Sequence, residues 1–242
     1  MTPLRQRADR LLVERGLFES RAKAQAAIEA GLVRANDATV RKASEVIAVD
    51  ATLEASAAHP YVSRAGVKLA AALDHFGFDP KGRICLDVGA STGGFTQVLL
   101  ERGAKSVYAV DVGRDQLHAS LRVRPEVISL EATDIRTLAL PGEPPNLIVV
   151  DVSFISLKLV LPAALALAKT SAQLVALIKP QFEAGRAALK RGIVRDTAVH
   201  ATVCDDISKF MTTLGWRVLS IEPSPITGGD GNTEFLIGAD KQ

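Results

Sequence analysis

The spacing of hydrophobic and polar positions changes near residue 60 and divides the chain into two parts. In residues 1–60, two short apolar runs with the period of helices are followed by short extended runs. Ser20 is placed to cap the second helix, Gly31 to end it, and Asn36-Asp37 to form a turn. This part is predicted to be a small α+β domain of two helices followed by a hairpin, with residues 55–60 as a linker.

In the second part, residues 61–242, short apolar strands alternate with longer helical stretches. This alternation predicts an α/β fold with a doubly wound, mostly parallel sheet. A long helical run precedes two final strands that have no helix between them, so the last strand is expected to be antiparallel. The seven predicted strands cover residues 84–88, 107–110, 127–130, 147–150, 174–178, 217–221 and 234–237.

Composition limits the classes of protein that the chain can represent. Of its 242 residues, 48% are hydrophobic, which is enough for packed cores in a large and a small domain. Its longest apolar run, residues 159–168, is roughly half as long as a bilayer span, and its N-terminus lacks the apolar segment of a secretion signal. Only two cysteines occur, Cys85 and Cys204, so we expect reduced thiols and no metal site. The expected location is cytoplasmic, without a membrane partner.

Charge alone does not identify a partner. The net charge of +2 permits contact with nucleic acid, and residues 1–60 hold nine Lys or Arg against eight Asp or Glu, so any RNA affinity must come from local clustering. The basic residues near the second helix and the turn are either an RNA-binding face or a solvated surface. They are Arg21, Lys23, Arg34, Arg41 and Lys42.

The order of residues in this part resembles the S4 RNA-binding domain. The resemblance is carried by RLLVERGLFESRAKA from Arg10 and AGLVRAND from Ala30, and it covers nearly all of residues 5–54. It implies that the second helix and the hairpin lie on structured RNA, with phosphate contacts by Arg21, Lys23, Arg34 and either Arg41 or Lys42. Asp37 departs from the family, which usually has Gly there, so the turn is expected to be built differently.

A glycine-rich turn follows the first strand of the second part. In the run DVGASTGGFT from Asp87, the glycine spacing differs from the G-x-G-x-x-G of dinucleotide binding, which disfavours a dehydrogenase. Asp111 ends the second strand, where a carboxylate can accept hydrogen bonds from a ribose diol, and Asp134 follows the third, where it can accept one from an adenine amino group. These residues indicate an adenosine-bearing cofactor, although caps and turns alone would also explain them. The candidate cofactor residues are Asp87, Gly89, Ala90, Ser91, Gly93, Gly94, Phe95, Asp111 and Asp134.

Four ionisable residues are candidates for the chemical step. Lys68 precedes the first strand of the sheet, and the other three, Asp151, Lys179 and Glu234, occur at ends of strands that should meet at the carboxyl edge. A hydroxyl group is a poor nucleophile until its proton is removed, so a base within reach is useful. Lysine can serve when it is neutral, which a second ammonium nearby favours and nearby carboxylates oppose. Each residue alone could instead be a solvated strand end.

These segments together resemble the TlyA family of ribosomal RNA methyltransferases. The resemblance is carried by YVSRAGVKL from Tyr61, DVGASTGGFT from Asp87, DVSFISL from Asp151, LIKPQFE from Leu177 and GNTEF from Gly231, and it spans essentially the whole chain. It implies a Rossmann-like class I methyltransferase fold, similar to the FtsJ (RrmJ) enzymes, and S-adenosylmethionine as cofactor. The family's catalytic tetrad then falls on Lys68, Asp151, Lys179 and Glu234, with Lys179 as the base. Ala65 stands where many relatives have Gly.

The resemblance implies 2′-O-methylation of cytidine in 16S and/or 23S ribosomal RNA. A basic segment after Lys179 is then expected to touch RNA phosphates through Arg186, Lys190, Arg191 and Arg195, although a solvated loop is the alternative. Three other functions stay open. The protein could be a non-catalytic RNA-binding or ribosome assembly factor, a membrane-active protein as the family's hemolysin label suggests, or a methyltransferase for a small molecule or protein.

Overall fold

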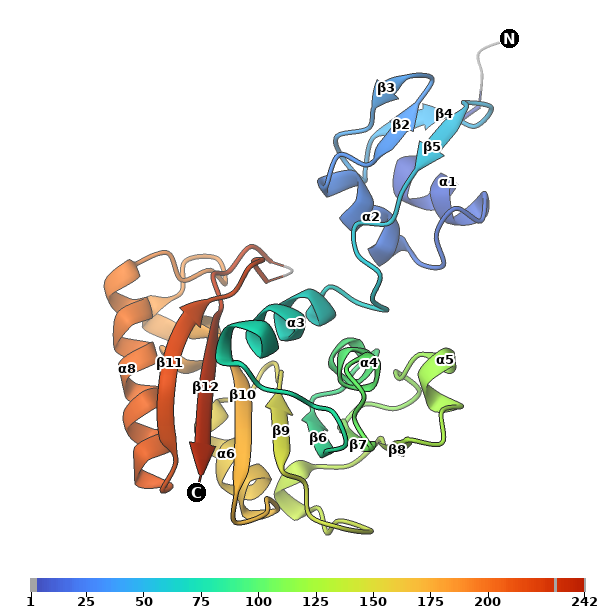
Figure 1. Ribbon diagram of the computed structural model, residues 1–242. Helices are drawn as coiled ribbons and strands as arrows, with labels where there is room; N and C mark the ends of the chain where they lie inside the picture. Colours follow the sequence, from blue (N-terminus) through green and yellow to red (C-terminus); the bar gives the residue numbers. More distant parts are fainter. Residues whose placement is uncertain (1–3, 229, 242) are drawn as a thin grey trace. The chain divides into compact units, whose positions relative to one another are not determined.

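The computed structural model describes residues 4–228 and 230–241, without the side chain of Arg186. The chain forms two compact units, Met1–Pro60 and Tyr61–Gln242, and each unit has its own hydrophobic core (Figure 1). No helix in the described part of the chain is long and apolar enough to cross a membrane.

The first unit packs two helices against short strands. Its core contains Leu11, Leu12, Ile28 and Val33, and the Ser20 hydroxyl caps the second helix by accepting from the Lys23 amide. Strand β1 pairs with β4, and β2 pairs with both β3 and β5. The predicted helices and hairpin are present, whereas β1 and β5 were not predicted. The elements are β1 (Arg5–Arg7), α1 (Ala8–Glu14), α2 (Arg21–Glu29), β2 (Val33–Ala35), β3 (Ala38–Thr39), β4 (Val46–Ala48) and β5 (Leu53–Ala55).

The turn between β2 and β3 is a two-residue hairpin turn. Ala35 pairs with Ala38, and the two residues between them, Asn36 and Asp37, have left-handed φ angles of 48° and 64°. Positive φ at both central positions is the conformation that suits the twist of a tight hairpin, and Asn and Asp are among the residues that tolerate it. Asp37 therefore forms this turn with the backbone conformation that glycine would supply.

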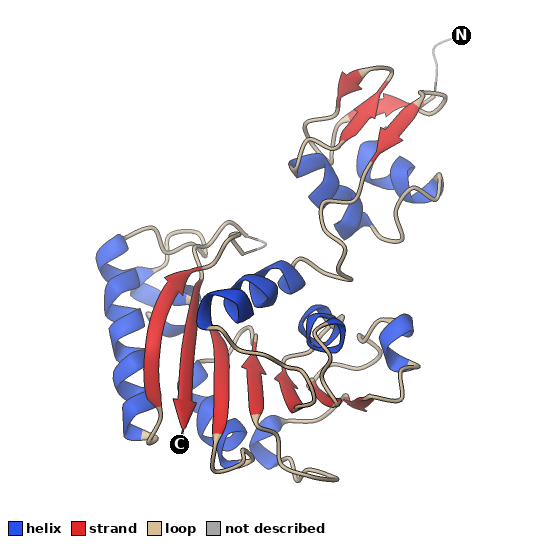
Figure 2. Ribbon diagram, viewed as in Figure 1, coloured by secondary structure: helices blue, strands red, loops and turns tan. Residues whose placement is uncertain are grey.

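The second unit contains a seven-stranded sheet in the order β11-β12-β10-β9-β6-β7-β8. Strand β12 runs antiparallel to both of its neighbours, and its arrow points opposite to that of β11 in Figure 2. The predicted fold class, with its antiparallel last strand, is confirmed. The strands are β6 (Ile84–Val88), β7 (Ser106–Val110), β8 (Val127–Leu130), β9 (Leu147–Val150), β10 (Ala172–Ile178), β11 (Arg217–Pro223) and β12 (Phe235–Lys241).

Helices cover both faces of this sheet, because alternate residues of each strand point to opposite sides (Figure 1). Leu86 and Ile148 face the core under α6 and α8, whereas Cys85 and Val149 face the core under α3 and α4. Both cysteines are free thiols, with Cys85 buried and Cys204 half-buried. The helical elements are α3 (Ala65–Phe76), α4 (Gly94–Glu101), α5 (Ala119–Arg122), η1 (Ile135–Thr137), α6 (Leu157–Ala166), α7 (Pro180–Glu183), η2 (Arg186–Ala188) and α8 (Thr197–Thr213).

Candidate active site

The sheet brings three of the four candidate reacting residues to one edge. Asp151 directly follows β9, Lys179 directly follows β10, and Glu234 directly precedes the antiparallel β12. Ile178 pairs with Phe235, so Lys179 and Glu234 extend from adjacent positions of neighbouring strands. This is the carboxyl edge, where open α/β sheets bind their ligands.

The four residues form two lysine–carboxylate pairs. The Lys68 ammonium, on α3, donates to Glu234 Oε2. Lys179 Nζ lies 2.5 Å from Asp151 Oδ1 as an ion pair and donates to Ser153 Oγ at 3.0 Å. Lys68, Lys179 and Glu234 are only 7%, 8% and 3% exposed, respectively. Separating either pair would leave a buried charge without compensation, which is energetically costly. Each pair therefore keeps both of its side chains in place.

The first turn of α3 is packed closely enough to place Lys68 at this edge. A Cβ atom on Gly66 would lie 2.4 Å from Cγ of Tyr61, and one on Gly94, at the start of α4, would lie 2.2 Å from Ser63 Oγ. Neither position has space for a side chain, so the two helix starts approach as near as their backbones allow. Ala65 shares this contact, with its Cβ 3.2 Å from the same Gly94 position, and its methyl group is accommodated.

A pocket of about 560 Å³ adjoins the Lys179–Asp151 pair, and its volume lies in the range of small-molecule sites. It lies at the carboxyl ends of β6, β7 and β9. Asp151 and Ser153 form part of its wall, so one carboxylate belongs both to the pocket and to the ion pair. Of the candidate cofactor residues, Gly89, Ser91, Asp111 and Asp134 line this pocket, together with the apolar side chains of Val88, Val110, Val112, Ile135, Val152 and Ile155.

Asp111 holds the glycine-rich loop in place. Its Oδ2 accepts from the Ser91 amide at 2.8 Å and its Oδ1 from the Gly113 amide at 2.7 Å. Ser91 has a left-handed φ of 46°, which directs its amide toward this carboxylate. A carboxylate oxygen can accept more than one hydrogen bond, so Asp111 retains capacity to accept from a ligand in the pocket.

Asp134 is held as a carboxylate by its neighbour in η1. Hydrogen bonds from the Arg136 side chain and amide lower the pKa of Asp134 to about 2. Arg136 Nη2 lies 2.6 Å from Asp134 Oδ2, and both residues line the pocket. Any ligand amino group that binds Asp134 therefore shares that carboxylate with Arg136.

The remaining candidate cofactor residues do not line the pocket, but they support the backbone of the glycine-rich loop. Asp87 is fully buried, and its Oδ2 accepts from Thr96 Oγ1 at 2.6 Å, which ties β6 to the first turn of α4. Burial raises the pKa of Asp87 to about 7. Gly93 has a φ of 95°, and a Cβ atom there would lie 2.3 Å from Cδ1 of Leu121. Ala90, Gly94 and Phe95 are buried in the packing around this loop.

Two further residues of the site, Ser153 and Phe154, were not among the candidate residues, although both lie in the run DVSFISL. Ser153 Oγ accepts the hydrogen bond from Lys179. Phe154 lines the pocket and is 91% exposed. Phe154 also has a left-handed φ of 66°, which is rare for a bulky residue and costs backbone energy. An exposed aromatic ring held in a strained conformation is the kind of feature that marks a functional site.

Comparison with known proteins identifies the family. The FtsJ-like methyltransferase family matches residues 61–241, and the S4 domain family matches residues 6–53. The 16S/23S rRNA (cytidine-2′-O)-methyltransferase TlyA of Mycobacterium tuberculosis is 43% identical over 96% of this chain and 89% of its own. The chain belongs to the TlyA family of FtsJ-like methyltransferases.

Two other members resemble the chain along almost its whole length. YqxC of Bacillus subtilis, named as a candidate rRNA methyltransferase, is 46% identical over 98% of this chain and 86% of its own. The solved structure of a protein from Streptococcus thermophilus, named as a candidate hemolysin, is 42% identical with a TM-score of 0.79. It covers 100% of this chain and 90% of its own. The resemblance to TlyA proteins inferred from the motifs is confirmed.

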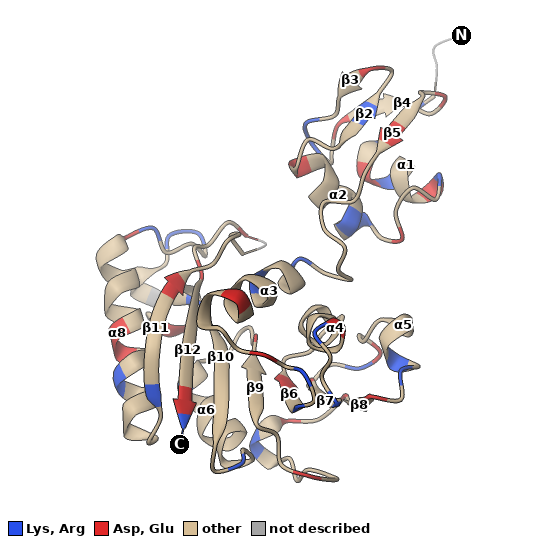
Figure 3. Cartoon of the chain, in the orientation of Figure 1, with Lys and Arg blue, Asp and Glu red and all other residues tan. Residues whose placement is uncertain are grey.

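The basic loop of this TlyA family member, between α7 and α8, is tied to the segment before β12 that contains Glu234. Asn232 is 1% exposed, and its side chain accepts from the Val194 amide and donates to the Gly192 carbonyl, each at 3.0 Å. The side chains of Lys190, Arg191 and Arg195 are exposed, and Figure 3 shows positive charge on this loop. The side chain of Arg186 lies outside the described residues.

In the S4 domain of this family member, several of the candidate RNA contacts already have partners within the unit. Arg21 pairs with the buried Asp9 at 2.5 Å, Lys23 pairs with Glu19 at 2.6 Å, and Arg34 donates to the Asp37 carbonyl at 2.6 Å. The Arg21 side chain is nevertheless 49% exposed, and Arg41 and Lys42 are exposed. The partners within the unit orient Arg21, Lys23 and Arg34.

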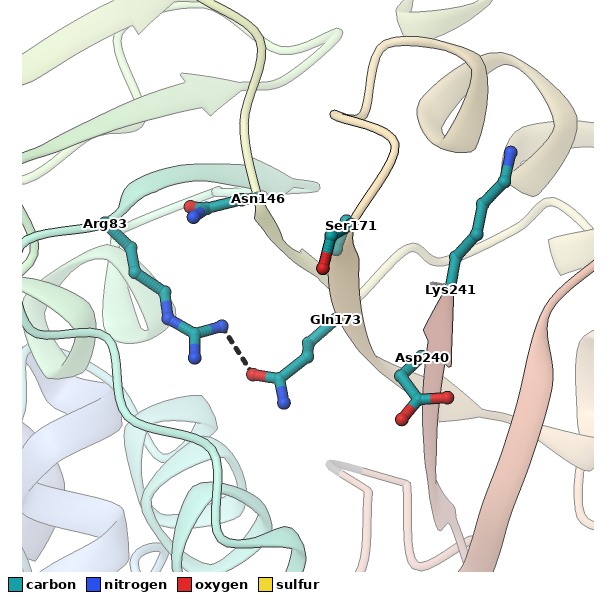
Figure 4. A pocket seen from close by; sticks show the side chains of 7 residues that line it. Arg83, Asn146, Ser171, Gln173, Asp240 and Lys241 are labelled. Atoms are coloured by element: carbon teal, nitrogen blue, oxygen red, sulfur yellow. Dashed lines mark hydrogen bonds between the residues drawn. The ribbon is translucent and has the colours of Figure 1, made fainter.

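A smaller hollow of about 260 Å³ lies at the opposite edge of the sheet, where the parallel strands begin. Figure 4 shows Arg83 and Gln173 pointing toward each other in it, and Arg83 Nη1 donates to Gln173 Oε1. No candidate site residue is among those that line it. It is also remote from the carboxyl edge that binds ligands in this class of fold.

Proposed function

We propose that this protein transfers a methyl group from S-adenosylmethionine to the ribose 2′-hydroxyl of cytidine in 16S and/or 23S ribosomal RNA. The supporting observation is that the Lys179–Asp151 pair adjoins a pocket suited to an adenosine, with the Lys68–Glu234 pair at the end of the neighbouring strand. S-adenosylmethionine supplies an electrophilic methyl group when it is bound. The named activity of the Mycobacterium tuberculosis relative supports the same reaction. A ribosomal substrate implies that the protein works in the cytoplasm.

The pocket has the groups that an adenosine requires. Asp111 has spare acceptor capacity for a ribose diol, and Asp134 is an ionised acceptor for an adenine amino group. Apolar side chains, Val112 and Ile135 among them, provide surfaces for the faces of the base. Asp87, Gly93 and Gly94 support the pocket indirectly, because they fix the backbone of the loop that carries Gly89 and Ser91.

The lysine pairs act on the ribose hydroxyl. Lys179, in its neutral form, would accept the hydroxyl proton at Nζ as the ribose oxygen bonds to the methyl carbon and the sulfur of the cofactor leaves as a neutral thioether. Asp151 then lies against the resulting ammonium, at the contact of 2.5 Å already formed in the structure. Lys68 and Glu234 hold each other beside this site, where they orient the incoming hydroxyl and exclude water from it.

The substrate is held by surfaces of both units. Phe154 presents its exposed ring at the pocket wall, where the base of a nucleotide swung out of its helix can stack. Lys190, Arg191 and Arg195 contact nearby phosphates, and Arg21, Lys23, Arg34 and Arg41 of the S4 domain contact folded RNA. The S4 domain supplies affinity for structured RNA, and the second unit supplies the reaction.

The test is methyl transfer to separated ribosomal subunits from a strain that lacks the enzyme. Labelled S-adenosylmethionine is incubated with the wild type, with Lys179→Ala, and with Lys158→Ala, which replaces an exposed lysine on α6 as a matched control. The modified riboses are then mapped by their resistance to alkaline cleavage. We expect discrete labelled cytidines with the wild type and the control, and none with Lys179→Ala. No label on either subunit, with cofactor binding intact, would instead support a non-catalytic assembly factor.

A further inference from the structure

A second cavity is lined by Phe235, the residue after Glu234, and lies on the other face of the sheet from Lys68. Glu234 contacts Lys68 of α3, whereas Phe235 packs against the core under α6 and α8. The cavity has a volume of about 560 Å³. It is lined by Ile193, Val194 and Arg195 of the basic loop, Thr197 and His200 of α8, and Pro223, Gly231, Thr233 and Phe235 around the connection from β11 to β12.

The loop wall of this cavity is held rigidly by buried side chains. The Val194 amide donates to Asn232 Oδ1 at 3.0 Å, and the Val194 carbonyl lies 2.9 Å from Nε2 of His200. Asn232 is 1% exposed and His200 is 8% exposed. Both backbone polar groups of Val194 are therefore held by buried side chains, so the cavity does not have to be ordered by its ligand.

The chemistry of the lining fits a nucleobase. The half-buried ring of Phe235 and the side chain of Ile193 offer surfaces for the face of a base. The buried ring of His200 supports Phe235, with the two ring centroids 5.5 Å apart. The hydroxyls of Thr197 and Thr233 can meet the polar edge of a base. The exposed guanidinium of Arg195 is placed to contact a phosphate.

The position of the cavity fits a neighbour of the target nucleotide. Lys179 directly follows β10, and the cavity lies over the ends of β12 and β11, which are one and two strands away. This is about 5–10 Å along the sheet, on its opposite face. A ribose can reach the lysine pairs only if its nucleotide leaves the helix, which also unstacks the adjacent bases. An unstacked base at this distance needs a surface, and the cavity provides one.

We propose that this cavity is a nucleotide subsite that binds the base one or two positions from the methylated ribose. The proposal rests on the proposed function, because it assumes that RNA crosses this edge of the sheet. It predicts that the enzyme depends on the presence of a base at one flanking position, separately from its dependence on the target base itself.

The experiment uses ribosomal RNA fragments that contain the mapped target cytidine and a single abasic ribose at each flanking position in turn. The kcat/KM for methyl transfer is measured for the full chain and for Phe235→Leu, which removes one ring of the subsite. In the wild type, an abasic ribose within two positions of the target should lower kcat/KM about tenfold, the usual effect of losing one stacked base. Phe235→Leu should show a similar loss on intact RNA and little further loss on that abasic RNA.

Two further variants keep the result interpretable. Lys190→Ala removes a charge from the same loop without altering the cavity lining, so it should weaken all fragments equally and retain the abasic effect. Arg195→Ala combined with Thr197→Val alters only the exposed wall, and it replaces Phe235→Leu if the latter fails to fold. It too should lessen the abasic effect.

Equal kcat/KM for all abasic fragments with the wild type, while intact RNA is methylated, would overturn the subsite and leave the proposed function standing. An abasic effect that persists undiminished in the cavity variants would also overturn it. If intact RNA is not methylated at all, the proposed function fails first, and the subsite fails with it.

Discussion

The buried carboxyl group of Asp87 should make the stability of the second unit depend on pH in an unusual direction. Asp87 is fully buried, its Oδ1 has no hydrogen-bond partner in the described part of the chain, and burial raises its pKa from 3.8 to about 7. Between pH 4 and 7, the folded protein keeps the proton that the unfolded chain releases. Stability from this group is therefore fully present below pH 4 and is lost as pH rises toward 7.

The size of the effect follows from the same pKa values. The difference between 3.8 and about 7, at about 1.4 kcal/mol per pH unit, corresponds to about 4 kcal/mol of lost stability above pH 7. Asp87→Asn removes this ionisation while keeping an oxygen that can accept from Thr96. The variant should be about as stable as the wild type near pH 4 and more stable by up to about 4 kcal/mol at pH 8.

The assay is urea unfolding followed by the fluorescence of Trp216, the single tryptophan, which is buried in the second unit. Asp74→Asn is a control of opposite sign. The hydrogen bond from Arg102 lowers the pKa of Asp74, so the ionised carboxylate stabilises the native protein at pH values above its usual pKa, and the variant should lose that stability there. If the wild type and Asp87→Asn show the same dependence on pH, or if Asp87→Asn is the less stable protein at pH 8, the reasoning is wrong.

Three more outcomes are expected. Asp111→Ala should weaken S-adenosylmethionine binding at least about tenfold in calorimetry, because it removes a diol acceptor and releases the Ser91 loop; unchanged affinity would contradict this role. Lys190→Glu with Arg191→Glu should weaken rRNA binding and flatten its salt dependence, with salt titration as the measurement and an unaltered slope as the contrary result. Asp9→Asn should destabilise the first unit by about 1–2 kcal/mol at neutral pH, since Arg7 and Arg21 are half-exposed and their pairs are partly screened. Hydrogen exchange in α1 and α2 would reveal the change. The difference should begin to shrink below pH 4 and disappear only in strong acid, because Arg7 and Arg21 hold the pKa of Asp9 far below its usual range.

Much of the second unit could be predicted from local patterns. The runs 84–88, 127–130 and 147–150 became strands with those bounds, because strands inside a parallel sheet are covered on both faces and read as short apolar runs between turns. The short strands of the first unit could not all be predicted in this way. Strands β1 and β5 have three residues each, and the charged sequence of β1 gives no apolar alternation, so they form through pairing with β4 and β2.

The glycines of the candidate cofactor loop serve two different purposes. The sequence indicated that its glycines allow close approach to a ligand, and Gly89 does line the pocket. Gly93 and Gly94 are instead required by protein packing, against Leu121 and Ser63. Residues so far apart in the chain reveal no contact in the sequence, so the reason for each glycine could be assigned only from the structure.

The sequence by itself determined which residues could react, because strand order and direction send Asp151, Lys179 and Glu234 to one edge. Tertiary structure decided how they are paired. Lys68 meets a carboxylate 166 residues away, and Lys179 meets Asp151 and Ser153. The physical reason is that strand periodicity is encoded locally, whereas the partner of a buried charge depends on the helix packing that brings the two groups together.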